Sequence, residues 1–437
     1  MAKGLERALG TRDLTLLVVG NVIGSGIFLV PSTVLAQAGS VRWAMGAWLF
    51  GGVLSLFGAL TYGELGAMDK GSGGLYAYIR DAFGPFLAFI YGWTLFFVIG
   101  SGTIATLAVA AANYMSQFAP LGPLVRKLIA IGLLALMAVI NILGTRRSAN
   151  VQNVATLIKA GAIVVMSVVL LALGNVGSAF DALPTSMAGS TSALAALGVA
   201  MISVLWAYEG WQYVTFSAGE ATDPQRSFPR AIALGTLFLI VLYLVANLAY
   251  LAALGPERVA VSERVAGEAV AATMGAAAGQ LIALVIIISM YSAAHATVIT
   301  SPRVYFTMAG DGLFFRRLAE VHPRYGTPAF AIGANCVWAM VLAATGTFEQ
   351  LLTYVVFVGW IFYGLGAASI FVFRRRRPDT ERPFRVPGYP WTPALFVLSA
   401  VALVLNTIVE QPVQAAIGIG VVLLGAPAYL VWRGRPG

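Results

Sequence analysis

The sequence has 437 residues, of which 59% are hydrophobic and 10% are charged, and its formal net charge is +9. A soluble globular domain carries about 25% charged residues, so this composition excludes a soluble protein and favours a chain embedded in a lipid bilayer. The positive charge does not indicate a nucleic-acid partner, because the densest basic run, Arg374–Arg377, caps an apolar run as a topology anchor does.

Apolar runs of about 20 residues recur from end to end, and each is long enough to cross the hydrocarbon core of a bilayer. Closed β-barrels also span membranes, but they need alternating segments of about ten residues, which are absent. The sequence therefore predicts an all-α, polytopic membrane protein with twelve transmembrane helices. The expected spans are residues 14–38, 43–67, 84–118, 124–143, 151–174, 193–219, 230–254, 275–309, 328–346, 349–373, 391–409 and 413–432.

The basic residues are distributed unequally between the two sets of loops. Of the 27 lysines and arginines, 21 fall in the termini and every second loop, five fall in the opposite loops, and Lys159 lies inside a span. The positive-inside rule therefore predicts a multi-pass protein of the cell (inner or plasma) membrane with both termini in the cytoplasm. The polar segment Met1–Asp13 and the long first apolar run argue against a cleavable signal peptide. A disulfide within the chain is excluded because Cys336 is the only cysteine.

The first span contains two glycines and a serine within one turn, in the segment Ile23–Ile27. Each glycine weakens a helix by about 1 kcal/mol relative to alanine, and its lack of bulk lets a ligand approach the backbone. If the helix unwinds here, free N–H groups at the start of the second half-helix attract a carboxylate. The alternative is that the small residues allow close packing between helices.

The sixth span carries an acid at membrane depth, Glu209, beside Gly210. An ionisable group there costs at least about 2.5–3.5 kcal/mol on insertion scales, so it lines a cavity or has a partner. The interruptions in the first and sixth spans are five helices apart, which is the spacing of two inverted repeats with a central site between them. Trp206 is a candidate lid over a bound substrate, and the alternative role of Trp206, Tyr208 and Trp211 is core packing.

Two further ionisable residues lie within spans. Lys159 lies in the fifth span, where the free-energy cost of placing a charge in the bilayer is too high for the residue to be incidental. It is a candidate for proton uptake and release. The alternative is a position near the cytoplasmic interface, from which its side chain reaches the headgroups. His295, in the eighth span with Thr297 nearby, is a candidate proton relay or a packing residue.

Tyr243 and Asn247 share one face of the seventh span, because they are four residues apart. They are expected either to hydrogen-bond the opened first span or to join neighbouring helices.

Four segments of the sequence are familiar: GNVIGSGIFLVP (Gly20–Pro31), the glycine-rich stretch Gly63–Trp93, AYEGWQYVTFSAGEATDPQRSFPRAI (Ala207–Ile232) and TSPRVYFTMAGD (Thr300–Asp311). Together they resemble the amino acid–polyamine–organocation superfamily, and within it the L-type amino acid transporter family and its prokaryotic homologues. The resemblance covers nearly the whole chain, and its most specific parts are GSGIF and AYEGW.

The resemblance implies one transmembrane transporter domain over residues 1–437, with a LeuT-type fold of two five-helix inverted repeats. The first repeat would occupy 1–174 and the second 193–373, and the accessory helices would lie at 391–432. No cofactor and no bound metal are expected.

The resemblance also implies the substrate site. The α-carboxylate would meet the N–H groups of Gly24, Ser25 and Gly26. The α-amino group would meet carbonyls near Ile23, Trp206 and Ala207, and Trp206 would be an aromatic gate. The candidate substrate-binding residues are Ile23, Gly24, Ser25, Gly26, Ile27, Trp206, Ala207, Tyr208 and Glu209.

Lys159 matches the lysine that stands at a sodium site in sodium-independent members, and Thr297 is assigned to the same coupling position. Tyr243 matches a tyrosine that bridges toward the first span, with Asn247 in support. The implied function is Na⁺-independent exchange of small or large neutral L-amino acids by alternating access. Proton-coupled symport, or carriage of cationic amino acids or polyamines, remains the alternative.

Two departures from the family pattern bear on these expectations. Animal members attach to a heavy chain through a cysteine after the third span, and this chain has none there, so no disulfide-linked partner is expected. Glu209 occupies a position that varies in the family, which leaves the preferred substrate side chain open.

A channel is disfavoured because no ring of acids or filter motif appears. An enzyme is disfavoured because HExxH, GxSxG and paired-carboxylate patterns are missing.

Overall fold

The computed structural model describes residues 9–68, 73–181 and 193–433. In these ranges the chain is helical and contains no strand, apart from an isolated parallel bridge between Leu9 and Ala221. The helices are α1 (Thr11–Val22), α2 (Gly26–Leu29), α3 (Pro31–Ala38), α4 (Val41–Met68), α5 (Leu75–Phe83), α6 (Pro85–Thr94), the π-helical turn η1 (Leu95–Ile99), α7 (Gly100–Met115), α8 (Pro123–Ile142), α9 (Thr145–Leu173), the 3₁₀ turn η2 (Gly177–Phe180), α10 (Ala193–Ala207), the 3₁₀ segment η4 (Trp211–Glu220), α11 (Pro224–Leu254), α12 (Pro256–Val261), α13 (Val265–Met274), α14 (Ala276–Thr300), α15 (Pro302–Gly310), the 3₁₀ turn η5 (Arg316–Ala319), α16 (Ala329–Thr345), α17 (Phe348–Arg376), α18 (Trp391–Glu410) and α19 (Pro412–Arg433).

Ten helical stretches of the described chain are long and apolar enough to cross a membrane. They coincide with ten of the twelve expected spans, and they make the chain a multi-pass, all-helical membrane protein. The sixth expected span leaves the α-helix at Ala207 and continues as η4. The ninth, α16, has only 17 residues. The total of twelve therefore stays a prediction.

Proline sets the start of several helices. Pro85, Pro123 and Pro302 each stand at the first position of a helix, where the missing N–H costs nothing and the fixed φ suits the helix. Pro302 also marks the boundary between α14 and α15 within the eighth expected span, because it has no N–H to donate to the helix.

The helices at the rim of the bundle present apolar side chains outward. On α8, Leu124, Leu128 and Val139 are more than half exposed. Exposed apolar surface on this scale marks contact with a partner or a membrane, and its length here suits lipid. By contrast, the stretch Pro85–Met115, which runs through α6, η1 and α7, is almost entirely buried.

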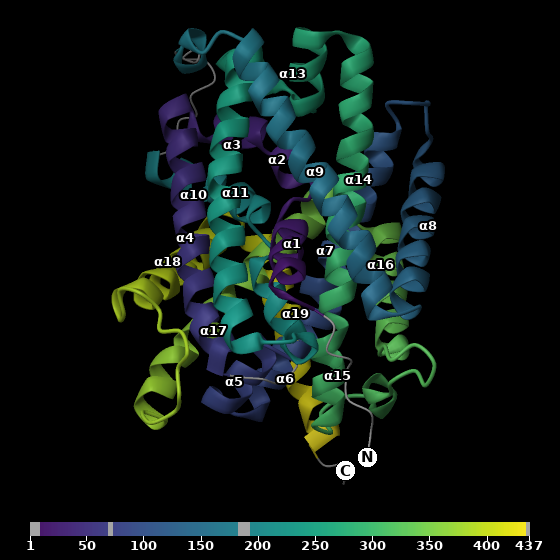
Figure 1. Ribbon diagram of the computed structural model, residues 1–437, viewed down its shortest axis with the longest axis vertical. Coiled ribbons are helices and arrows are strands. Elements are labelled where there is room, and N and C mark those ends of the chain that lie inside the picture. The colour runs from purple at the N-terminus through teal and green to yellow at the C-terminus, as the bar shows by residue number, and fades with distance from the viewer. Residues whose placement is uncertain (1–8, 69–72, 182–192, 434–437) are drawn as a thin grey trace.

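The first span lies at the centre of this arrangement. Figure 1 shows α1 in the middle of the bundle with α11 and α14 on either side, and α1 contacts α9, α11, α14 and η4. The lower end of the view is filled by α5, α6 and α15, whereas α2, α3 and α13 lie above α1. The interruption between α1 and α2 therefore falls inside the bundle, level with its core.

Candidate functional site

The first span unwinds at the predicted glycines. α1 ends at Val22, Ile23 is extended (φ −71°, ψ 93°), and α2 begins at Gly26. In the described chain, no backbone carbonyl accepts a hydrogen bond from the N–H groups of Gly24, Ser25 or Gly26. These N–H groups are therefore available to an acceptor that enters the break.

The carbonyl groups on the other side of this break are occupied by side chains. Lys159 Nζ donates to Gly20 O at 2.7 Å and to Ile23 O at 2.5 Å. Tyr243 Oη donates to Val22 O at 3.1 Å, and Ser289 Oγ lies 3.3 Å from Ile23 O. The unwound carbonyls thus have donors from three surrounding helices, α9, α11 and α14, which satisfies them without water.

The sixth span breaks beside the first. α10 ends at Ala207, and Gly210 has φ +125°, a conformation that side chains other than glycine rarely adopt. A Cβ at Gly210 would lie 2.9 Å from the carbonyl carbon of Asn21. A Cβ at Gly26 would lie 2.6 Å from Ala207 Cβ and closer still to Ala207 Cα. Both glycines therefore let the two broken helices pack backbone against backbone.

A small cavity of about 20 Å³ lies between the two breaks. Its walls include Gly24, Ser25, Gly26, Trp206 and Glu209. A water molecule needs about 10–15 Å³ of such space, so in this conformation the cavity holds about one water and no amino acid. Trp206 Nε1 donates to Ser25 Oγ at 3.1 Å, which ties the candidate gate directly to the unwound segment.

Glu209 is buried in the wall of this cavity, with 7% of its surface exposed. Its Oε1 atom accepts from Gln212 Nε2 at 2.8 Å and from Tyr213 Oη at 3.3 Å, and Tyr363 Oη donates to the same oxygen. Gln212 and Tyr213 were not singled out in the sequence, although they follow Glu209 by three and four residues. Tyr363 lies in α17, and no local pattern connects it with the sixth span.

Lys159 is fully buried against the first span rather than at an interface. A second polar link beside it was not anticipated. Ser292 Oγ, on α14, donates to Gln152 Oε1 at 3.2 Å, and Gln152 Nε2 lies 3.2 Å from Thr156 Oγ1. This link joins α9 to α14 on the side of the first span where the carbonyls are occupied.

Other predicted residues lie away from the cavity. Asn247 donates to Tyr243 O within its own helix, and Thr297 donates to Ala293 O within α14. His295 is fully buried and stacks on Tyr291, and neither ring nitrogen has a hydrogen-bond partner in the described chain. The geometry therefore joins Tyr243 to the break, but not Asn247, Thr297 or His295.

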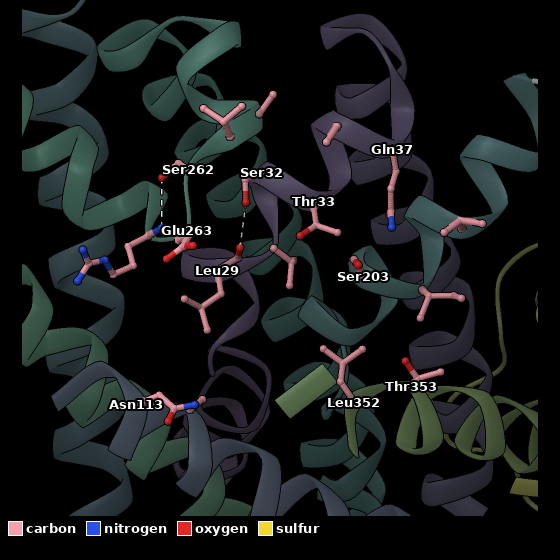
Figure 2. A pocket seen from close by; sticks show the side chains of 18 of the residues that line it. Leu29, Ser32, Thr33, Gln37, Asn113, Ser203, Ser262, Glu263, Leu352 and Thr353 are labelled. Carbon is pink, nitrogen blue, oxygen red and sulfur yellow. Dashed lines mark hydrogen bonds between the residues drawn. The ribbon is translucent and has the colours of Figure 1, made fainter. Parts of the chain in front are cut away.

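A much larger cavity of about 1000 Å³ opens above the central one. We call it the vestibule. It is bordered by α2, α3, α7, α10, α17 and the connection between α12 and α13. Figure 2 shows Ser262 and Glu263 on one side of the vestibule and Gln37, Ser203 and Thr353 on the other. About half of the lining residues are polar or charged, and the rest are apolar.

The opposite face is closed by buried ion pairs that the sequence analysis did not single out. Arg303 Nε and Nη2 donate to the two carboxylate oxygens of Glu220 at 2.9 and 3.1 Å, and both side chains are buried. Nearby, the backbone of Leu9 pairs with Glu220 and Thr222. The bundle is therefore hollowed on the side of the vestibule and packed around this ion pair on the opposite side.

Comparison with known proteins adds an independent observation. A family model described as "Amino acid permease" matches residues 9–430, which include both breaks and the vestibule. The serine/threonine exchanger SteT of Bacillus subtilis (strain 168) is 31% identical over 435 residues, covering 99% of this chain and 98% of that protein. The b(0,+)-type amino acid transporter 1 of Rattus norvegicus is 32% identical over 419 residues, with coverages of 93% and 84%. The cystine/glutamate transporter of Homo sapiens is 31% identical over 452 residues, with coverages of 99% and 88%.

Proposed function

Because the chain belongs to the amino acid permease family, we propose that it exchanges neutral L-amino acids across the cell membrane by alternating access, without sodium. Transport between two faces requires a site that each face reaches in turn. The central cavity suits this role, because it lies between two broken helices, with the vestibule on one side and the buried Arg303–Glu220 pair on the other.

The position of Lys159 is the observation that supports transport without sodium. Its ammonium group donates to two carbonyls of the unwound first span. Carbonyl oxygens of unwound helices are the ligands that coordinate a transported cation in carriers of this kind. A fixed positive charge on the same oxygens disfavours a sodium ion there by direct repulsion.

The free N–H groups of Gly24, Ser25 and Gly26 support an α-carboxylate on the other side of the break. Because Trp206 bonds Ser25, the gate must release this contact before a carboxylate reaches those N–H groups. Binding of the substrate and movement of the gate are thus coupled through one residue.

Neutral substrates are our leading choice because Oε1 of Glu209 already accepts three hydrogen bonds from neighbouring side chains. The second candidate, cationic amino acids or polyamines, is favoured by the position of the same carboxylate in the cavity wall.

We further propose that the chain acts without a disulfide-linked partner and that its termini face the cytoplasm. Its single cysteine, Cys336, is buried in α16. The excess of basic residues in the termini and every second loop supports the orientation. In that orientation the vestibule opens to the outside.

The test uses purified protein in proteoliposomes, with uptake of radiolabelled L-serine as the readout. Vesicles preloaded with unlabelled L-serine should take up more label than empty vesicles, uptake should saturate, and choline should replace sodium without loss. A strict requirement for sodium would contradict the proposal. Uptake into empty vesicles that is driven by an inward proton gradient would instead favour proton symport.

A further inference from the structure

We propose that an anionic phospholipid binds in a cavity at the start of α8, where Arg126 and Lys127 hold its phosphate. The cavity has a volume of about 240 Å³ and lies between α7, α8 and the junction of α16 with α17. Its walls include Asn113, Pro123, Arg126, Lys127 and Thr347, and we call it the α8 cavity. A single water needs only about 10–15 Å³, so the α8 cavity has room for a phosphate group. The orientation proposed above places it in the outer leaflet.

The lining of the α8 cavity is positively charged. Arg126 and Lys127 border it, and none of the other described residues on its walls is acidic. These two residues are also among the five basic residues that fall in the loops opposite the termini. The positive-inside rule gives basic residues on that side no role as topology anchors. An anion in the cavity explains why both charges are present there.

Arg126 offers one edge of its guanidinium group to a ligand. Its Nη1 atom donates to Asn113 Oδ1 at 3.3 Å, which holds the side chain against α7. Its Nε atom is buried and has no hydrogen-bond partner within the described chain. Arg303 uses the Nε edge of its guanidinium group to bind the carboxylate of Glu220. The same edge of Arg126 matches two oxygens of a phosphate in the same way.

Two helix starts add hydrogen-bond donors to the same space. Pro123 occupies the first position of α8, and no side chain of the described chain caps this end. The free backbone N–H groups of that first turn favour a negative charge. On the facing wall, Thr347 caps α17 and its Oγ1 atom accepts from Gln350 N at 3.4 Å. The hydroxyl hydrogen of Thr347 therefore remains to donate.

The position of the α8 cavity favours a lipid over a free ion. α8 has 20 residues, which span about 30 Å, the thickness of the hydrocarbon core. Its first turn therefore lies at the level of the headgroups. Leu124 and Leu128, in the first two turns, are 69% and 59% exposed, and Figure 1 shows α8 at the edge of the bundle. A phosphate in the cavity thus places acyl chains along an apolar helix surface.

A lipid held in this way joins a peripheral helix to the rest of the bundle. Its phosphate would contact the start of α8 and the start of α17 at once. Because the cavity exists only in the folded protein, a bound lipid should raise the melting temperature by mass action. Asn113, which Figure 2 labels, borders both the α8 cavity and the vestibule, so the lipid would lie beside the vestibule and away from both helix breaks.

The experiment is native mass spectrometry of the delipidated full-length protein, titrated with phosphatidylglycerol or phosphatidylcholine. The wild type should retain one phosphatidylglycerol more tightly than any phosphatidylcholine. Arg126→Gln and Lys127→Gln should each weaken its binding about fivefold, and the double variant about 25-fold, as expected for basic residues at a charged membrane surface. The matched control is Arg42→Gln, an exposed arginine at the start of α4 on the same side and outside the cavity, which should bind like the wild type.

The melting temperature gives a second readout. Phosphatidylglycerol should raise it more in the wild type than in the double variant, whereas inorganic phosphate alone should raise it in neither. Lys127→Gln keeps the test valid if Arg126→Gln does not fold, because Lys127 is exposed. Equal retention of phosphatidylglycerol by the wild type and the double variant would overturn the proposal. Displacement of the lipid by inorganic phosphate, with the same rise in melting temperature, would show that the cavity binds a free anion and would overturn the lipid assignment.

Discussion

Gly26 is the residue at which the two broken helices come closest. A valine there would place its Cβ 2.6 Å from Ala207 Cβ, and overpacking of this kind costs about 1–3 kcal/mol. We expect Gly26→Val to abolish uptake of L-serine and its tight binding. The matched control is Gly132→Val on α8, where no atom lies within 4 Å of the new Cβ, and its uptake should stay near wild type. Wild-type uptake by Gly26→Val would mean that the substrate does not approach this backbone.

Lys159 is the second residue whose substitution has a specific expected effect. Removing its ammonium group leaves Gly20 O without this donor and leaves Ile23 O with only the longer bond from Ser289 Oγ. A buried carbonyl that loses its partner costs about 1–3 kcal/mol. We expect Lys159→Ala to lower the uptake rate and the melting temperature while the protein still folds. Lys127→Ala, at an exposed position on α8, serves as the control. If Lys159→Ala transports at the wild-type rate, the lysine has no role in the cycle.

Substitution of Glu209 distinguishes between the two candidate substrate classes, neutral and cationic. If its carboxylate contacts the substrate side chain, a charge-assisted hydrogen bond worth about 1.5–3 kcal/mol favours cationic or polar amino acids. We expect Glu209→Gln to lower the rate or the melting temperature without reordering a panel of neutral, cationic and acidic competitors. This outcome follows from the three donors that already engage Oε1. A loss of cationic relative to neutral competitors in this variant would show that Glu209 selects the side chain.

The residues that the sequence predicted and those that it missed differ in a physical way. Gly26 and Lys159 break local rules, since glycine weakens a helix and a charge is costly in a bilayer. Such conflicts can be recognised from the sequence alone. Gln152 and Tyr363 break no local rule, and their importance comes from partners 140 and 154 residues away in the chain. Only the packing of the helices reveals them.

At the scale of elements, the positions of the helix breaks were predictable but their form was not. The glycines predicted an interruption near residue 24, yet the division of the outer half into α2 and α3 depends on Pro31 at the first position of α3. In the sixth span the hydrophobic run continues after Gly210, so composition alone did not show that the chain becomes a 3₁₀ segment there. The first run coincides with a helical stretch long enough to cross a membrane, whereas the sixth does not. The hydrogen-bond pattern inside both runs needed the structure.

The closed face depends on α15 and η4, joined by Arg303 and Glu220. Removing one member of a buried ion pair typically costs about 3–5 kcal/mol, because the other charge stays buried and unpaired. We expect Arg303→Met to lower the melting temperature strongly. Arg80→Met, which breaks a half-exposed pair with Asp311, should lower it by the equivalent of about 1 kcal/mol or less. Equal shifts in the two variants would show that the buried pair does not hold the closed face.

At the scale of the whole molecule, orientation is the property to test. Each label site is a single cysteine introduced into a Cys336→Ala background, which lacks the buried native cysteine. In intact cells, an impermeant maleimide should label Glu257→Cys and should label Asp379→Cys only after the membrane is permeabilised. Both positions are exposed. The reverse pattern would invert the proposed topology and place the vestibule on the cytoplasmic side.

The overall architecture was the most predictable feature, because few backbone structures can span a bilayer. Backbone groups must be satisfied within each span, so long apolar runs become helices whatever their detailed sequence. The vestibule was not predictable, since its walls come from six separate parts of the chain and its residues are individually ordinary. The same holds for the peripheral position of α8, which no local signal distinguishes from the buried run through α7.

The contact of Lys159 with the first span has a thermodynamic consequence. A diffusible ion performs work by binding on one side of the membrane and leaving on the other, so its gradient can drive a substrate uphill. An ammonium group that is covalently attached to α9 occupies the same carbonyls but never dissociates from the protein. As a fixed charge it therefore couples no sodium gradient to the cycle. In an exchanger built this way, accumulation of one amino acid is limited by the outward gradient of another, and at steady state the two concentration ratios become equal.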